Sequence, residues 1–109
     1  MSKYRNKKVD IDGIIFDSIA ESRRYLILKQ MEIAGDITHL RLQPKFDYMA
    51  ENSKKKLFTY KADFDYCTDD GQYVVEDVKS KATAKLPVFR LKKKLIEDRF
   101  NVKITEITL

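Results

Sequence analysis

Apolar and polar residues alternate in two neighbouring segments, LFTYKADFDYC at 57–67 and QYVVEDVK at 72–79. A period of two is typical of β-strands with one buried face. The short sequence Asp69-Asp70-Gly71 lies between them, and Gly71 can adopt the left-handed conformation that a tight turn requires. The pattern therefore predicts a β-hairpin. We expect the buried face of its first strand to carry Phe58, Tyr60, Ala62, Phe64 and Tyr66.

The N-terminal half predicts a hairpin, a helix and a strand. Residues 8–18, KVDIDGIIFDS, favour a hairpin that turns at Asp12-Gly13. A helix is expected over 18–34, with Ser18 as its N-cap and Gly35 as its C-terminal stop. LQPKFDY, at 42–48, predicts a strand. The apolar residues expected on the buried side of the helix are Leu26, Ile27, Met31 and Ala34.

After the hairpin, SKATAKLP predicts a basic loop, and Pro87 suits the first turn of a helix over 87–100. The residues expected on the buried side of this helix are Val88, Leu91, Leu95 and Ile96. VKITEITL, at 102–109, predicts a strand parallel to 72–79, reached by a right-handed crossover. The order β-hairpin, α, β, β, β, α, β indicates a single domain over residues 1–109. Its class is α/β, with a mixed sheet flanked by helices.

The turn determines which hairpin residues lie opposite each other. A three-residue loop pairs Thr68 with Gln72, and so pairs Asp63 with Asp77. A two-residue loop would instead place Phe64 opposite Asp77 and mix the two faces. In the first register the two aspartates have Cβ atoms about 4.5 to 5.5 Å apart. Opposed carboxylates repel, and the pKa of one of them rises unless a positive charge intervenes.

Two interpretations of these acids remain open. A divalent cation between Asp63 and Asp77 would relieve the repulsion, and hard oxygen ligands suit Mg²⁺ or Mn²⁺. Lys79 lies on the same face as Asp77 and can reach a phosphate or a metal-bound water. Alternatively, the acids form the solvent-exposed face of the sheet and pair with Lys61 and Lys79.

The distribution of charge is a weaker indication of the kind of partner. The chain has 22 Lys and Arg against 17 Asp and Glu, a net charge of +5. Residues 78–96 contain seven basic residues and no acid. Such a segment indicates contact with nucleic acid, or else a basic face in solvent. The residues from which we expect DNA contacts are Lys81, Lys85, Arg90, Lys92 and Lys93.

Other features limit the class of protein. The single cysteine, Cys67, excludes an internal disulfide and is typical of a reducing compartment. No apolar run approaches the roughly 20 residues that span a bilayer, and residues 1–10 lack the apolar segment of a signal peptide. We therefore expect no membrane association and a location in the cytoplasm of the host cell.

The motifs FDSIAESRRY, LQPKF, YKADFDY and VVEDVKS together resemble a family of small phage and prophage proteins assigned to the PD-(D/E)XK nuclease superfamily. The resemblance implies a restriction-endonuclease-like core. It implies that Asp63 and Asp77 bind the metal, that Val78 contributes its backbone carbonyl, and that Lys79 is the signature lysine. Ala62 stands where the signature has proline. Glu21 matches the helical acid that many members place beside the hairpin, and the resemblance implies that it helps to hold a metal ion.

Several residues have a second interpretation. Ser18 and Glu21 also have the spacing of a capping box, in which the Glu21 carboxylate accepts from the Ser18 amide. Asp65 shares the face of Asp63 farther along the strand, and Glu76 is expected on the opposite side of the sheet. Gln43 could contact DNA or a water, but we favour a polar residue that ends a strand. His39 is expected in a loop.

The resemblance implies a Mg²⁺-dependent endonuclease that hydrolyses DNA, with Glu21, Asp63, Asp77 and Lys79 at its centre. Phosphate contacts carry little sequence information, so we expect selectivity for structures such as branched DNA. The alternatives are a catalytically silent DNA-binding module and a subunit of a phage recombination or packaging assembly with other phage proteins. A homodimer is also expected, because one small domain offers little surface to a duplex.

Overall fold

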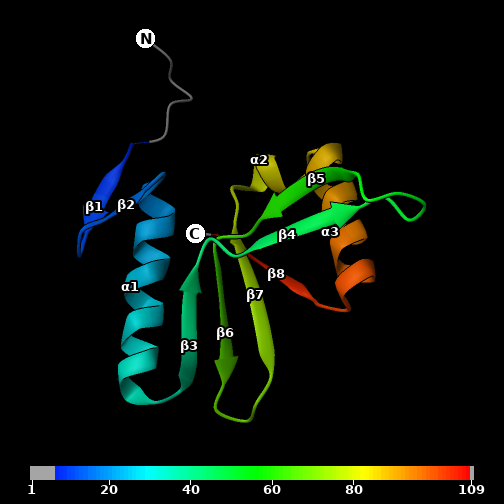
Figure 1. The fold of residues 1–109 in the computed structure, drawn as a ribbon. Helices are drawn as coiled ribbons and strands as arrows, with labels where there is room; N and C mark the ends of the chain where they lie inside the picture. Colours follow the sequence, from blue (N-terminus) through cyan, green and yellow to red (C-terminus); the bar gives the residue numbers. More distant parts are fainter. Residues whose placement is uncertain (1–6, 109) are drawn as a thin grey trace.

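The computed structural model describes residues 7–108 and has a mixed α+β fold (Figure 1). Two strands precede the first helix, five strands follow it, and two helices and a final strand complete the described residues. In chain order they are β1 (Val9–Ile11), β2 (Ile14–Phe16), α1 (Ile19–Ala34), β3 (Ile37–Leu42), β4 (Lys45–Met49), β5 (Lys56–Lys61), β6 (Phe64–Thr68), β7 (Tyr73–Val78), α2 (Lys81–Ala84), α3 (Pro87–Phe100) and β8 (Ile104–Ile107). Leu109, within the predicted last strand, lies outside the described residues.

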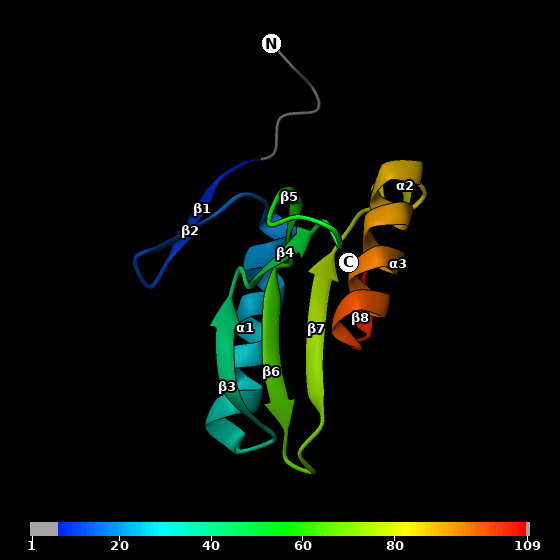
Figure 2. The same ribbon diagram turned by 45° about the vertical axis from the view of Figure 1, so that its right-hand side comes forward.

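The central sheet has four strands in the order β3-β6-β7-β8. β6 is antiparallel to both β3 and β7, whereas β8 is parallel to β7, as predicted. Helix α1 lies against β3 and β6, and α3 lies on the side of β7 and β8 (Figure 2). β1 and β2 form the predicted N-terminal hairpin, and β4 pairs with β5 in a separate hairpin. The mixed sheet with flanking helices agrees with the expected class.

The β3–β4 and β5–β6 segments form one antiparallel ribbon that bends in the middle. Leu42 pairs with Phe64 and Lys45 pairs with Lys61. Between these pairs, the Gln43 amide donates to Asp63 O at 2.9 Å, and the Ala62 amide donates to Pro44 O at 3.0 Å. Both strands therefore leave the central sheet at the same point, which we call the ribbon bend (43–44 and 62–63).

The ribbon bend corrects three predictions. The segments 42–48 and 57–67, each expected as a single strand, are both interrupted at the bend. β3 was also not predicted, so His39 lies in a strand and not in a loop. Apolar alternation continues through Ala62, and the sequence pattern therefore shows no break at that position.

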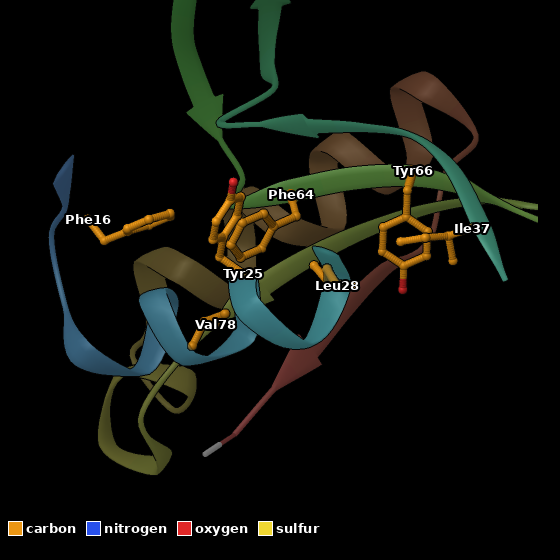
Figure 3. Packing of buried hydrophobic residues seen from close by; sticks show 7 residues of the cluster. All are labelled: Phe16, Tyr25, Leu28, Ile37, Phe64, Tyr66 and Val78. Atoms are coloured by element: carbon orange, nitrogen blue, oxygen red, sulfur yellow. The ribbon is translucent and has the colours of Figure 1, made fainter. Parts of the chain in front are cut away.

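The bend also divides the predicted buried face between two hydrophobic clusters. Tyr60 and Ala62 pack with Val75, Ile96 and Ile104, on the side of α3. Phe64 and Tyr66 instead pack on the side of α1 (Figure 3), in a cluster completed by Phe16, Tyr25, Leu28, Ile37 and Val78. The alternate residues are buried as expected, except for the half-buried Phe58, but they do not share one core.

Helix α1 has the predicted caps but not the predicted buried side. The Ser18 hydroxyl accepts from the Glu21 amide at 3.1 Å, and Gly35 ends the helix with a φ of 87°. Of the four predicted residues, Met31 packs against the core, whereas Leu26 is 47% exposed and Ile27 and Ala34 are exposed as well. The buried residues of α1 are Ser22, Tyr25 and Leu28. Polar residues occupy part of the side of α1 that faces the core. The spacing of apolar residues therefore predicted the wrong side of the helix.

The C-terminal helices need similar corrections. Residues Lys81–Ala84 form the short helix α2 where a loop was predicted. α3 begins at Pro87 and ends at Phe100, as expected, and Ile96 is buried. However, Val88 is 64% exposed and Leu91 also faces solvent, because Phe89 points inward instead, beside the predicted Ile96. Within residues 7–108, no helix is long and apolar enough to cross a membrane.

Candidate active site

The β6–β7 hairpin has the register that the three-residue turn predicts. Phe64 pairs with Glu76, and the Thr68 amide donates to Gln72 O at 2.8 Å. Gly71 takes the expected left-handed conformation, with a φ of 87°. This register directs Asp63 towards Asp77 at the bend end of the hairpin.

The ladder changes next to Asp63. The Ala62 amide bonds Pro44 across the ribbon bend and so does not continue the β6–β7 ladder. The Val78 amide donates instead to Asp63 Oδ2, at 2.6 Å. The Asp63 carboxylate is therefore held at the end of the ladder by a backbone donor of the neighbouring strand.

The Asp77 carboxylate is 1% exposed and incompletely hydrogen-bonded. The Tyr60 hydroxyl donates to Oδ2. Lys79 Nζ lies 2.9 Å from Oδ1, an ion-pair distance, although no side chain of the described residues makes a well-directed hydrogen bond to that oxygen. The buried carboxylate is therefore held between a phenol on one oxygen and an ammonium group on the other.

The Asp63 and Asp77 carboxylates influence each other. Burial raises the pKa of Asp63 to about 8, from an ordinary value of 3.8. The Val78 amide opposes this rise in pKa, whereas the negative charge of Asp77 and a proton shared with it increase the pKa further. The two aspartates therefore favour a proton, or another positive charge, between them.

Glu21 lies on the first turn of α1 and faces the same region. Burial and then Asp17 raise its pKa, and Lys79, Asp77 and Lys61 also act on the Glu21 charge. The Ser18 half of the capping box is present, but no bond from the Ser18 amide to the Glu21 carboxylate occurs in the described residues. The geometry favours the interpretation in which Glu21 faces the hairpin.

Two cavities meet at Glu21. One, of about 260 Å³, is polar and is lined by Ser18, Glu21, Val78, Lys79, Ser80 and Thr83. The other, of about 140 Å³, lies on the side of β2 and reaches Glu21, Gln43 and Asp63. The Gln43 position, expected only to end a strand, therefore borders the candidate site.

Asp65 and Glu76 have structural partners outside this site. Glu76 accepts from Arg24 Nε at 2.8 Å and from Arg24 Nη2 at 2.6 Å, and it lies on the opposite face from Asp77, as expected. Asp65 accepts from Arg41 Nε at 2.9 Å and from the Tyr73 hydroxyl at 2.6 Å. Both acids, like Asp77, are 1% exposed, so the expectation of a solvent-exposed acidic face is wrong for Asp65 and Asp77. The pairing with Lys79 that this interpretation expected is confirmed for Asp77.

The sequence reasoning missed Tyr60 and Arg24. Tyr60 was assigned to the core, and its ring does lie there, but its hydroxyl reaches Asp77. The positions of Tyr60 and Asp77 in two predicted strands did not predict this hydrogen bond. The bond forms only because the chain turns at the ribbon bend. Arg24 lies three residues after Glu21, on the same side of α1, and this spacing could have suggested it as a partner of a sheet carboxylate.

The basic residues differ in their availability. Lys81 and Lys85 are exposed. Arg90 and Lys93 both contact Glu106, at 2.9 and 2.5 Å, and the Lys93 side chain is only 16% exposed. Lys92 Nζ lies 5.3 Å from the centre of the Phe58 ring. Of these five residues, Lys81 and Lys85 are therefore the most available to a ligand.

Comparison with known proteins places the chain in a family. A family model described as a protein of unknown function (DUF1064) matches residues 1–108. The chain belongs to this family. No curated protein and no solved structure gives a significant match. All the candidate site residues of this DUF1064 member lie within the matched region.

Proposed function

We propose that this chain is a metal-dependent phosphodiesterase that cleaves DNA and has a restriction-endonuclease-like core. The observation that carries the proposal is the meeting of two carboxylates at the bend end of the hairpin. Asp77 is buried and ion-paired with Lys79, and Asp63 beside it has a raised pKa. The Lys79 Nζ atom lies 2.9 Å from Asp77 Oδ1.

The donor set fits a hard divalent cation. Mg²⁺ is commonly bound by one or two carboxylates and keeps several waters. Asp63 and Asp77 provide these carboxylates, and the Val78 backbone carbonyl is a third oxygen nearby. No group of three His, Cys, Asp or Glu side chains in residues 7–108 is arranged to hold a metal. We therefore propose that Glu21 does not bind the metal ion directly.

Bound Mg²⁺ or Mn²⁺ would lower the pKa of a water and offset charge on the scissile phosphate. The residues of the chain prepare the site for this chemistry. Tyr60 holds Asp77 through Oδ2, and the Val78 amide holds Asp63. Both carboxylates are thus oriented before any ligand binds, which is the preorganisation that electrostatic catalysis requires.

The polar cavity supplies the remaining groups. Lys79 and Glu21 both line it. The Lys79 ammonium can stabilise negative charge that develops on the phosphate oxygens. The Glu21 carboxylate, with a raised pKa, can accept a proton from the attacking water. Exposed Lys81 and Lys85, on and just after α2, would contact the backbone phosphates of the DNA.

The proposal is tested by incubating supercoiled plasmid and a synthetic four-way junction with the protein and Mg²⁺ or Mn²⁺. Asp77→Ala and Lys79→Ala should each abolish cleavage. The matched control is Asp69→Ala, which removes an exposed acid at the turn of the same hairpin and should cleave normally. Cleavage that survives both active-site substitutions would contradict the proposed centre.

Calorimetric titration with Mn²⁺ provides an independent measurement. The wild-type protein should bind Mn²⁺, and Asp63→Ala should bind it at least tenfold more weakly. Absence of Mn²⁺ binding, with DNA binding retained, would instead support the silent DNA-binding module.

A further inference from the structure

The smaller cavity shares Asp63 and Glu21 with the proposed hydrolytic site, but the hydrolysis gives no role to the rest of its lining. Its wall on the β2 side consists of Ile14, Ile15 and Phe16, and Leu42 and Phe64 close it from the sheet. The wall is attached to α1: the Tyr25 hydroxyl donates to Asp12 at 3.3 Å, and the Phe16 and Tyr25 ring centroids are 5.0 Å apart. The cavity is therefore apolar on most sides and bounded by folded elements.

The size of the cavity suits a flat ring. Its volume is about 140 Å³. An engineered protein cavity of about 150 Å³ with similar apolar walls binds benzene. A planar heterocycle is thus the class of ligand that this space and these walls favour, and an aliphatic chain would leave the polar end of the cavity without a partner.

The polar end carries Gln43, whose backbone is unusual. Its φ is 55°, a left-handed conformation that side-chain-bearing residues rarely adopt, and it precedes Pro44, which favours extended backbone. Glycine would take this conformation without cost. The side-chain amide of Gln43 provides one acceptor and two donors, the groups that pair with the edge of a nucleobase.

We propose that the cavity receives an unstacked nucleobase of the nucleotide next to the scissile phosphate, and that Gln43 hydrogen-bonds its edge. The inference rests on the proposed function, because Glu21 lines both cavities and Asp63, a proposed metal ligand, lines this one. A base within a duplex cannot enter a walled cavity without leaving its stack. We therefore expect a preference for DNA with unpaired nucleotides, such as a single strand or a flap, because these bases need the least energy to leave a stack.

The test measures binding without divalent metal, so that no cleavage occurs. Fluorescence anisotropy compares a ten-nucleotide oligothymidylate, a blunt duplex of equal length, and an oligomer of ten abasic deoxyribose phosphates. The wild-type protein should bind the oligothymidylate at least tenfold more tightly than the other two. Equal binding of the abasic oligomer, or tighter binding of the blunt duplex, would overturn the proposal.

Substitution of Gln43 separates recognition from backbone structure. Gln43→Gly removes the amide and relieves the left-handed strain, so Tm should rise by about 4 °C while oligothymidylate binding weakens at least tenfold. His39→Gly is the matched control, because His39 is exposed, lies in the same strand segment and has a φ of 59°. This control should also raise Tm but leave binding unchanged.

Retained oligothymidylate binding in Gln43→Gly would overturn the assignment of Gln43. The two proposals can fail separately. A base-dependent preference without any Mn²⁺-dependent cleavage would reject the hydrolytic function and keep the cavity. Cleavage of blunt duplex at the same rate in the wild type and Gln43→Gly would keep the function and reject the cavity.

Discussion

The hydroxyl of Tyr60, from β5, donates to Oδ2 of Asp77, from β7, and the Lys79 ammonium pairs with Oδ1 of the same carboxylate. The two residues belong to different sheets and meet because the ribbon bend places the end of β5 over the end of β7. Tyr60 is buried, and its pKa is raised by burial and by the negative charge of Asp77. The phenol therefore remains protonated and continues to donate.

Tyr60→Phe should lower the free energy of unfolding of the metal-free protein by about 1–3 kcal/mol, since a buried carboxylate oxygen loses its donor. The loss should shrink in Mn²⁺, because a cation bound by Asp77 supplies a positive partner. Urea unfolding with EDTA and with Mn²⁺ measures both values. Tyr48→Phe is the control, since the Tyr48 hydroxyl has no hydrogen bond among residues 7–108 and its ring also packs beside Phe58. Equal losses for Tyr60→Phe in both conditions would argue against a cation at Asp77.

The raised pKa of Asp63 predicts how stability depends on pH. Between its ordinary pKa of 3.8 and its folded value of about 8, Asp63 binds a proton in the folded state but not in the unfolded state. The Asp63 contribution to the free energy of unfolding should therefore decrease as pH rises through this window in metal-free protein. Urea unfolding from pH 5 to pH 8 should show this decrease in the wild type relative to Asp63→Asn.

A bound cation would replace the proton on the Asp63–Asp77 pair. Mn²⁺ should therefore raise Tm more at pH 8 than at pH 6, because at the lower pH it must displace the proton. Parallel pH profiles for the wild type and Asp63→Asn, in the presence and absence of Mn²⁺, would show that the two carboxylates do not share a charge.

Arg24 attaches α1 to the central sheet through the buried Glu76. Arg24→Leu leaves the Glu76 carboxylate without its cation and should lower the free energy of unfolding by about 3–5 kcal/mol. Arg23→Leu, one position earlier on the exposed side of the helix, should change it by no more than about 0.5 kcal/mol. Urea denaturation at pH 7 compares the two. The Tyr66 hydroxyl also donates to Glu76. A small loss for Arg24→Leu would mean that Tyr66 alone satisfies Glu76.

Asp65 and Asp77 have the same burial, but we expect them to have different roles. Asp65→Asn weakens the contacts with Arg41 and Tyr73, and it should lower the free energy of unfolding by about 1–3 kcal/mol without changing Mn²⁺ affinity. The loss should lie in the lower part of that range, because the Arg41 side chain is 67% exposed and its charge is well solvated. Asp77→Asn should instead weaken Mn²⁺ binding strongly. Calorimetric titration with Mn²⁺ measures the affinity of the two variants. An equal loss of Mn²⁺ affinity in both would mean that Asp65 also belongs to the metal site.

Lys81 and Lys85 should contribute more to DNA binding than Lys93. Removing one lysine that neutralises a phosphate lowers the slope of log affinity against log salt concentration by about 0.9. Lys81→Ala and Lys85→Ala should therefore each reduce the slope by nearly one, and Lys93→Ala should change it little because Glu106 already offsets the Lys93 charge. Salt titrations of duplex binding give the slopes. The same reduction for all three variants would mean that Lys93 leaves Glu106 when DNA binds.

The sequence predicted the parts of the site that depend on local chemistry. The Asp69-Asp70-Gly71 turn was sufficient to predict the hairpin register, and with it the approach of Asp63 to Asp77. Ser18 and Gly35 likewise identified the ends of α1, because capping involves only neighbouring residues.

The parts that depend on tertiary pairing could not be predicted in this way. The ribbon bend requires both strands to change sheet together, and neither strand alone shows it. The inward side of α1 was misassigned because Arg24 and Ser22 occupy it, and a polar residue becomes an acceptable buried residue only once its partner is known. On α3, exposed Val88 and Leu91 had the spacing expected of buried residues.

The ribbon bend also determines where the chain can change length. Removing one residue from β5 would slide Ala62 and Asp63 against Gln43 and Pro44, and alternation would turn the carboxylate to the other face. The connection 50–55 closes at the distal end, where the Ala50 amide donates to Lys55 O at 2.8 Å. Insertions in this connection would lengthen the tip of the β4–β5 hairpin and leave the ribbon bend unchanged. Natural length variation should therefore accumulate at that tip and be absent from the six residues of β5.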